Sequence, residues 1–310
     1  MNERNPDIPG WLSPAAAVAG ALAEGEPVLA LESTVIAHGL PRPRNLEVAL
    51  ELEERTRLVG CTPATIAVIG GKPTVGLDRA QLAAIATGGV AKLSTRELPL
   101  ARARRIDGAT TVAATARLAA ECGIRVFATG GIGGVHRGLP PDVSADLLEL
   151  RESALVVTCA GAKSILDLPA TRELLESLGV LVLGWRTDRF PAFYTSDSGI
   201  GVDARVESAE EVAEIWRAHR ELERPGAILL CVPIPEEHSL DPALVEGAIE
   251  GAMRTALSRG VTGKALTPFL LNALADSTSG ATLEANVALL RNNVDVGARV
   301  AVKIAESDGR

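Results

Sequence analysis

The segment from Val126 to Pro169 constrains the fold of this chain more than any other. It contains two short apolar runs, RVFATGG and ALVVTCAG, and glycine closes each of them. Apolar runs of this length that stop at glycine are typical of buried strands. In open α/β sheets, ligands bind in the loops that follow such strands. We therefore expect the loop Gly130–Asp146 to form the mouth of a site, with Lys163 pointing into it.

The composition favours an α/β fold with an aliphatic core. The chain has 310 residues, of which 47% are hydrophobic but only 3% aromatic. Alternating strand and helix patterns in such a chain are typical of a sheet covered by helices. We expect an α-β-α sandwich around a central mixed sheet, forming a single domain over residues 1–310 in which residues 1–12 are a loose N-terminal segment.

The periodicity and the turn residues place the elements. Besides the two runs above, strands are predicted at Pro27–Leu31, Thr65–Ile69, Thr74–Gly76, Val90–Ser94, Val180–Trp185 and Ala227–Val232. Helices are predicted at Pro14–Ala23 (after an N-cap at Ser13), Asn45–Val59, Arg79–Ala86 (after Asp78), Gly108–Glu121, Pro169–Leu178, Ser208–Leu222, Pro242–Arg259, Thr267–Ala275 and Leu283–Ala305. The irregular stretch 186–201 contains three aromatic residues, which suggests a lid or an oligomer contact.

Charge and cysteine usage narrow the possible partners. A net charge of −8 argues against nucleic-acid binding, which needs a basic surface. No apolar run approaches the roughly 18 residues of a membrane span, and the N-terminus lacks the apolar core of a signal peptide. The four cysteines are scattered without a CxxC pair. This pattern indicates reduced, buried thiols and a cytoplasmic protein that binds neither membrane nor nucleic acid.

Two side chains are candidates for covalent and acid–base chemistry. The chain has five Lys against 26 Arg, so a Lys in an apolar segment such as Lys163 is an unusual choice. Burial there favours the neutral amine, which forms Schiff bases, although an ion pair with a nearby Asp explains the residue equally. Glu32 leaves an apolar strand, where desolvation raises its pKa and makes it a plausible proton donor. A capping or salt-bridging role for Glu32 is the alternative.

Other residues suggest an anion and a metal. Thr111, at a helix N-terminus, offers a hydroxyl and free N–H groups to a phosphate, or simply caps the helix. Lys92 lies in a short strand and either reaches the same phosphate or extends to solvent. Asp142 either holds a hard cation or caps the following helix. His136 in the glycine loop and Asn286 in the last helix are weaker candidates, since either is often structural.

Several longer motifs occur together and in a fixed order. They are LESTVIAHGLPRPRN, ATTVAAT, VFATGGIGGVHRG, DVSADL, AGAKSILD, FPAF and ANVALLRNN. With them the chain, over roughly Pro27–Val302, resembles the pseudouridine-5′-phosphate glycosidase family, also called indigoidine synthase A-like. The resemblance implies reversible cleavage of pseudouridine 5′-phosphate to uracil and ribose 5-phosphate by a homotrimer that uses a divalent ion, usually Mn²⁺.

The resemblance also implies residue roles. Lys163 corresponds to the covalent nucleophile, Glu32 to the proton donor and Asp142 to the metal ligand. Substrate contacts are expected from Thr111 at its helix N-terminus and, by resemblance, from Lys92, Val112 (through its backbone), His136, Ser144, Ala145, Asp146 and Asn286.

These roles suit a carbon–carbon glycosidic bond, which a pair of glycosidase carboxylates does not cleave in the usual way. Attack by Lys163 opens the ribose, and protonation of the uracil carbon by Glu32 leaves an imine that water hydrolyses. Two alternatives remain from the residues alone. One is a Schiff-base lyase or aldolase acting on another phosphosugar, and the other is a phosphosugar-binding module without catalysis.

Overall fold

A computed structural model of the chain describes residues 8–138 and 142–308, and its central feature is an 11-stranded sheet. Its strand order is β1-β4-β3-β2-β7-β9-β13-β11-β12, with β6 beside β3 and β5 beside β6. The strands are β1 (Ser13–Pro14), β2 (Val28–Leu31), β3 (Thr62–Ile69), β4 (Lys72–Val75), β5 (Ala91–Leu93), β6 (Gly108–Thr110), β7 (Val126–Ala128), β9 (Val156–Cys159), β11 (Leu181–Trp185), β12 (Ala204–Val206) and β13 (Ile228–Cys231). A separate antiparallel pair joins β8 (Val135–His136) to β10 (Leu166–Asp167).

The middle of the sheet is parallel. Strands β2, β7, β9, β13 and β11 pair in parallel, while β3 runs antiparallel to β4 and β6. The sequences VLAL and ILLC are buried throughout, as strands covered on both faces require. The predicted mixed sheet is confirmed, and the carboxyl ends of its parallel strands share one edge.

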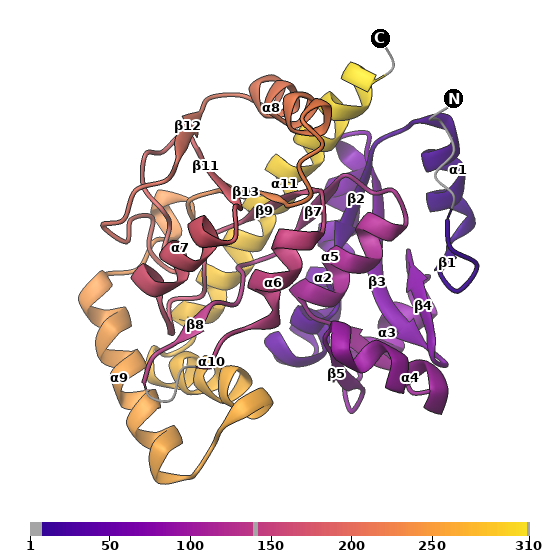
Figure 1. Cartoon of the computed structure of the whole chain (residues 1–310). Coiled ribbons are helices and arrows are strands. Elements are labelled where there is room, and N and C mark those ends of the chain that lie inside the picture. Colours follow the sequence, from indigo (N-terminus) through magenta and orange to yellow (C-terminus); the bar gives the residue numbers. More distant parts are fainter. Residues whose placement is uncertain (1–7, 139–141, 309–310) are drawn as a thin grey trace.

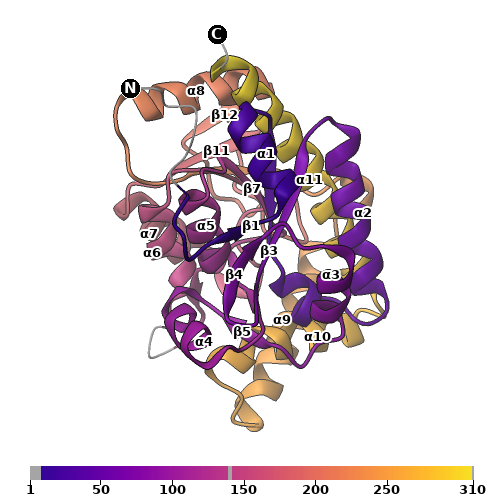
Figure 2. The same cartoon turned by 90° about the vertical axis from the view of Figure 1, so that its right-hand side faces the viewer.

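Helices cover both faces of the sheet. They are α1 (Ala16–Glu24), α2 (Arg44–Leu58), α3 (Arg79–Ala86), α4 (Leu98–Arg104), α5 (Val112–Glu121), α6 (Ala145–Glu152), α7 (Leu168–Ser177), α8 (Ala209–Glu221), α9 (Pro242–Ser258), α10 (Leu266–Ser277) and α11 (Ala281–Asp308), with a π-helix η1 (Val35–Gly39) and short 3₁₀ turns η2 (Thr95–Glu97), η3 (Glu236–His238) and η4 (Gly263–Ala265). Helices α5 and α6 lie in front of the sheet in Figure 1, and α11 crosses behind it. Seen from the side, α2 and α11 lie opposite α5, α6 and α7 (Figure 2). The predicted sandwich is therefore confirmed.

Local signals explain several helix boundaries. Helix α3 has the bounds that the sequence predicts. It begins after Asp78 because Asp78 accepts from the Gln81 N–H while the Gln81 side chain accepts from the Asp78 N–H. Ser208 accepts from the Glu211 N–H at the start of α8, but the Glu211 carboxylate bonds to the N–H of Glu207. The Ser–x–x–Glu sequence at the start of α8 therefore forms only half of a capping box.

Two predictions near the sheet were wrong. Ser13 does not cap a helix: it forms β1 with Pro14 beside β4, and α1 starts at Ala16. The physical reason is that Ser13 and Pro14 pair with Thr74 and Val75 at the sheet edge, so the backbone stays extended through Pro14 and the helix can begin only after Ala15. The segment Gly108–Thr110 is strand β6 and not the first turn of a helix, since it pairs with β3 and β5, and the helix starts only at Val112.

The aromatic side chains after β11 are packed inside the protein. Phe190, Phe193 and Tyr194 are 0%, 2% and 2% exposed, so they belong to the chain's own core. Apolar rings of this size contribute more when buried than when presented to solvent. Of the N-terminal segment expected to be loose, residues 1–7 lie outside the described part of the chain, and Leu12 is buried.

Two further observations concern the helices and the cysteines. Along the described residues, every helix is too short or too polar to cross a membrane. Cys61, Cys122, Cys159 and Cys231 are buried free thiols, as the scattered spacing predicts.

Candidate active site

A cavity of about 320 Å³ opens at the carboxyl edge of the central strands. Strands β2 and β5 lead into it, as do the loops that follow β7 and β9. Its wall contains all of the residues expected from the sequence: Glu32, Lys92, Thr111, Val112, His136, Asp142, Ser144, Ala145, Asp146, Lys163 and Asn286. The fold thus assembles one site from segments more than 250 positions apart in the chain, which is the position where open α/β sheets bind ligands.

Glu32 is the first residue after β2 and is only partly exposed to the cavity. The Thr129 hydroxyl donates to its Oε1. Burial raises the pKa of the Glu32 carboxyl, and the positive charge of Lys163 and the Thr129 hydrogen bond act against that rise. Glu32 caps no helix, and its raised pKa favours the protonated form that a proton donor needs.

Lys163 enters the cavity from the loop after β9. Ala162 forms a parallel bridge with Ile132, and the Lys163 N–H donates to the Ile132 carbonyl at 3.1 Å. The half-buried Lys163 amine donates to the Gly131 carbonyl at 2.8 Å. A neutral carbonyl holds the amine in place without neutralising a charge, so the amine remains available for chemistry.

Two helix N-termini meet at the cavity wall. Thr111 caps α5, its hydroxyl accepting from the Ala114 N–H at 3.4 Å. Ser144 caps α6, its hydroxyl accepting from the Asp146 N–H at 3.2 Å. Free N–H groups and the positive ends of two helix dipoles make this part of the wall suited to a phosphate.

The Asp146 side chain is already occupied by the protein. One carboxylate oxygen accepts from the Ala113 N–H at 2.9 Å and the other from the Gly133 N–H at 2.8 Å. Asp146 is 6% exposed and ties the start of α5 to the glycine loop. Asp146 thus lies in the cavity wall, where its carboxylate organises the backbone at the start of α5 and in the glycine loop.

The glycines of GGIGG are required for close packing. A Cβ on Gly131 would lie 2.5 Å from the Phe193 ring, and one on Gly133 would lie 2.3 Å from the Ser144 hydroxyl. One on Gly134 would lie 2.4 Å from the Thr171 hydroxyl. The backbone of this loop therefore approaches its neighbours more closely than any side chain would allow.

A backbone hydrogen bond joins His136 to Asp142. The His136 N–H donates to the Asp142 carbonyl at 2.8 Å. Burial lowers the pKa of the His136 imidazole, while the Asp142 carboxylate raises it. Asp142 itself is exposed and caps no helix, since Ser144 does so.

The surroundings of Asp142 test the expected divalent ion. Among residues 8–138 and 142–308, no three His, Cys, Asp or Glu side chains cluster as a metal site. A single exposed carboxylate does fit a hard cation that keeps most of its waters. The donor set therefore suits a hydrated ion at the cavity wall and does not suit a protein cage.

Asn286 reaches the cavity from the second turn of α11. Its side chain is 6% exposed, and its Oδ1 finds no hydrogen-bond partner within the described part of the chain. The Asn286 side chain therefore does not extend into bulk solvent. A buried amide oxygen without a partner costs free energy unless a ligand supplies the donor.

The sequence reasoning missed residues on the other side of the cavity. His38 lines it from the π-helix η1, Thr34 from the position just before η1, and Arg96 from η2. Thr34 Oγ1 and His38 Nε2 are buried without partners in the part of the chain that the structure describes. Burial, followed by the charge of Lys92, lowers the pKa of His38. A π-helix leaves no distinct sequence pattern, so only the fold reveals this part of the site.

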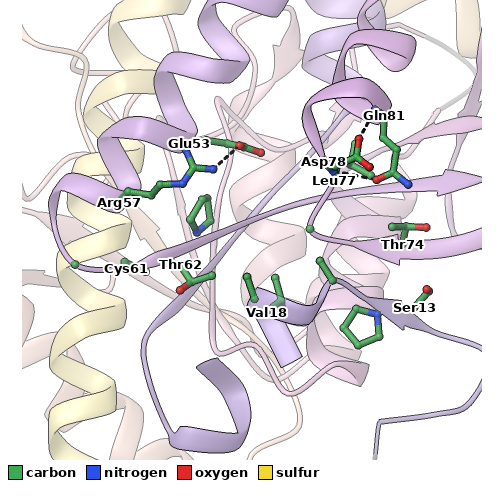
Figure 3. A pocket seen from close by; sticks show the side chains of 16 residues that line it. Ser13, Val18, Glu53, Arg57, Cys61, Thr62, Thr74, Leu77, Asp78 and Gln81 are labelled. Atoms are coloured by element: carbon green, nitrogen blue, oxygen red, sulfur yellow. Dashed lines mark hydrogen bonds and ion pairs between the residues drawn. The ribbon is translucent and has the colours of Figure 1, made fainter. Parts of the chain in front are cut away.

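A second hollow of about 640 Å³ lies at the opposite edge of the sheet (Figure 3). It is lined by Cys61 and Thr62, where β3 begins, and by the cap of α3. The Glu53 carboxylate there already accepts from Thr65 at 2.7 Å and from Arg57 at 2.9 Å. Because its charged groups pair with one another, this hollow is a weaker candidate than the cavity that contains Lys163.

Taken with the fold, the first cavity belongs to an α/β enzyme that acts on a small molecule bearing an anionic group. A family model described as "Indigoidine synthase A like protein" matches residues 17–303, and the chain belongs to that family. A pseudouridine-5′-phosphate glycosidase of Symbiobacterium thermophilum is 53% identical over 291 residues, which cover 92% of this chain and 94% of that protein. One of Chloroflexus aurantiacus is 54% identical over 296 residues, covering 93% and 97%.

Solved structures agree with this assignment. The prealnumycin C-glycosynthase AlnA in complex with ribulose 5-phosphate superposes with a TM-score of 0.89 at 38% identity, covering 97% of this chain and 99% of AlnA. An indigoidine synthase A-like protein of Thermotoga maritima gives a TM-score of 0.88 at 38% identity, covering 95% and 96%.

Proposed function

We propose that the chain cleaves the C-glycosidic bond of pseudouridine 5′-phosphate reversibly, giving uracil and ribose 5-phosphate through an imine on Lys163. The observation that carries the proposal is the shared cavity of the Lys163 amine and the Glu32 carboxyl, whose pKa burial raises. Family membership supports the substrate, because the relatives are named for it and AlnA is bound to a pentulose phosphate.

The first step forms a carbon–nitrogen bond. The neutral amine of Lys163 attacks the anomeric carbon of the ribose, and the bond from that carbon to the ring oxygen breaks. The ring oxygen leaves with its electron pair and takes the proton that the amine gives up. The opened ribose is then attached to Lys163 as a secondary amine and still carries the base.

The second step breaks the carbon–carbon bond. Glu32 gives its proton to the uracil carbon that bears the sugar. The electron pair of the bond returns to the uracil ring, while the lone pair of the Lys163 nitrogen forms the imine. Water then adds to the imine, ribose 5-phosphate leaves, and Glu32 and Lys163 recover their starting protonation states.

The remaining residues bind and orient the substrate. The N-termini of α5 and α6, with Thr111, Val112, Ser144 and Ala145, receive the phosphate, and Asp146 holds their backbone. Lys92 adds a positive charge, His136 supports the sugar, and Asn286 offers its amide to the uracil edge. The partners are thus small molecules.

Asp142 is the residue that would hold Mn²⁺ or another divalent cation. Such an ion would offset the charge of the bound phosphate. The free thiols, all buried, support the cytoplasmic location that we also propose, together with a single-domain homotrimer as the family resemblance implies.

Two measurements test the function. Borohydride reduction with ribose 5-phosphate should add the mass of a reduced pentose phosphate to the peptide that contains Lys163, and Lys163→Arg should abolish the adduct. The protein should also release uracil from pseudouridine 5′-phosphate. An adduct without uracil release would indicate a lyase acting on another phosphosugar, and the absence of both would leave only a binding module.

A further inference from the structure

Thr129 joins the proposed acid to the centre of the sheet. It follows β7 directly, is 1% exposed, and donates its hydroxyl to Oε1 of Glu32. Its N–H donates to the Thr158 carbonyl at 3.0 Å, so the residue is bonded on both sides. Because the backbone of Thr129 is fixed, its hydroxyl donates to the Glu32 carboxyl in one orientation.

The Thr129 peptide is also fixed from the opposite face of the sheet. Asn293 of α11 is fully buried, and its Nδ2 donates to the Thr129 carbonyl at 2.7 Å and to the Gly130 carbonyl at 3.2 Å. The helix that carries Asn286 into the cavity therefore also holds the strand end that carries Thr129. Buried side chains locked by such bonds keep a site within a narrow geometry.

We infer that Thr129 is a positioning residue for proton transfer, which fixes Oε1 of Glu32 so that the proton on Oε2 faces the substrate, and that Asn293 holds Thr129 in place. The inference rests on the proposed function, because it assumes that Glu32 is the proton donor. Neither residue needs to touch the substrate to act in this way.

The charges around Glu32 give the hydroxyl a second effect. Lys163 and Lys92 favour the ionised carboxyl, Asp146 opposes it, and the Thr129 bond favours it. A donor to the ionised form stabilises the carboxylate that remains after proton transfer. Without this donor, burial would keep the acid protonated to a higher pH.

The test compares Thr129→Val with Thr129→Ser and Thr56→Val. Thr56 is a matched control because it is also fully buried and donates its hydroxyl to the Leu52 carbonyl at 2.9 Å, within α2 and outside the bonds that hold Thr129. Uracil release from pseudouridine 5′-phosphate is measured across pH, with thermal unfolding of each variant. Thr129→Ala serves if Thr129→Val does not fold.

For Thr129→Val we expect kcat to fall about tenfold with KM nearly unchanged. We also expect the alkaline limb of kcat/KM to move to higher pH. Thr129→Ser should restore both, and Thr56→Val should change neither. If Thr129→Val matches Thr56→Val in kcat and in its pH profile, or if Ser does not restore them, the inference is overturned.

Glu32→Gln separates this outcome from a failure of the proposed function. If Glu32→Gln is inactive while Thr129→Val behaves like the control, only the positioning role is lost. If Glu32→Gln keeps its activity, Glu32 is not the proton donor, and the proposed mechanism and the inference both fall.

Discussion

At the scale of the residue, the site contains ionisable groups whose surroundings disfavour their charged form. Glu32 is the clearest case, since burial raises its pKa while Lys163 and Thr129 act against the rise. Such a group serves catalysis at the expense of stability. The pH dependence of folding should therefore report the same carboxyl that we assign to proton transfer.

We expect Glu32→Gln to be more stable than the natural chain at alkaline pH. The folded state keeps the Glu32 proton to a higher pH than the unfolded state, so stability falls as pH rises from the usual Glu pKa through the raised one. Gln avoids this loss and still accepts from Thr129. Thermal unfolding should show the two proteins converging near pH 4 and diverging above it.

Glu51→Gln provides the opposite control for that experiment. Its bonds to Arg291, both 2.7 Å, lower the pKa of Glu51. Its substitution should therefore cost stability at alkaline pH, and the cost should shrink as pH falls through the lowered pKa toward acid. Equal pH slopes for the two variants would contradict the assigned environment of Glu32.

Asp142→Asn should abolish binding of Mn²⁺ while leaving the fold intact. A neutral amide replaces the exposed carboxylate that we assign as the ligand, and hard cations prefer charged oxygen. The quenching of the free Mn²⁺ signal in electron paramagnetic resonance measures this directly. Asp188→Asn, at an exposed carboxylate that pairs with Arg205, should bind like the natural chain. If Asp142→Asn still bound Mn²⁺ tightly, residues other than Asp142 would have to hold the ion.

At the scale of the element, loops and helix ends decide how well the site is built. The GGIGG loop lies against Phe193, Ser144 and Thr171 because it has no side chains of its own. Its presence was evident from the sequence, since consecutive glycines after an apolar run indicate close backbone approach. Which groups it approaches depends on segments distant in the chain, and no local pattern encodes them.

Gly133→Ala should destabilise the loop and weaken ligand binding. The new Cβ would lie 2.3 Å from the Ser144 hydroxyl and 2.7 Å from Oδ2 of Asp146, so the cap of α6 must shift. We expect a loss of about 2 kcal/mol in unfolding free energy and at least a roughly tenfold weaker affinity for ribose 5-phosphate. Calorimetry measures both.

Gly247→Ala is the matched control for that substitution. This glycine lies within α9, and a Cβ on it meets no atom within 4 Å. We expect it to gain about 0.5–1 kcal/mol, because alanine favours the helix, with affinity unchanged. If Gly133→Ala behaved in the same way, the close approach at the α6 cap would have no role.

At the scale of the whole molecule, the sequence predicted the layers better than the connections. Continuous apolar strands and capped helices specify a covered sheet, and both signals are local. Strand β6 was missed because Gly108–Thr110 is short, and its pairing with β3 is visible only in three dimensions. The roles of Lys163 and Glu32 came from motifs, whereas η1 and Thr129 have no such signature.

We expect the chain to sediment and scatter light as three copies. The proposal comes from the family resemblance, and exposed apolar side chains such as Leu148 and Leu257, 60% and 84% exposed, offer surface for contacts. Multi-angle light scattering at micromolar concentration should give three times the mass of one chain. A stable monomer that retained uracil release would show that one copy suffices.

Helix α11 has a consequence for how the protein is made. It supplies Asn286 to the cavity, and its Asn293 bonds to the strand end that carries Thr129, although both residues follow Lys163 by more than 100 positions in the sequence. During synthesis, Glu32 and Lys163 leave the ribosome long before these two amides do. A nascent chain therefore carries the amine and the acid while the cavity is still incomplete, and the proposed site is assembled only after α11 has been made.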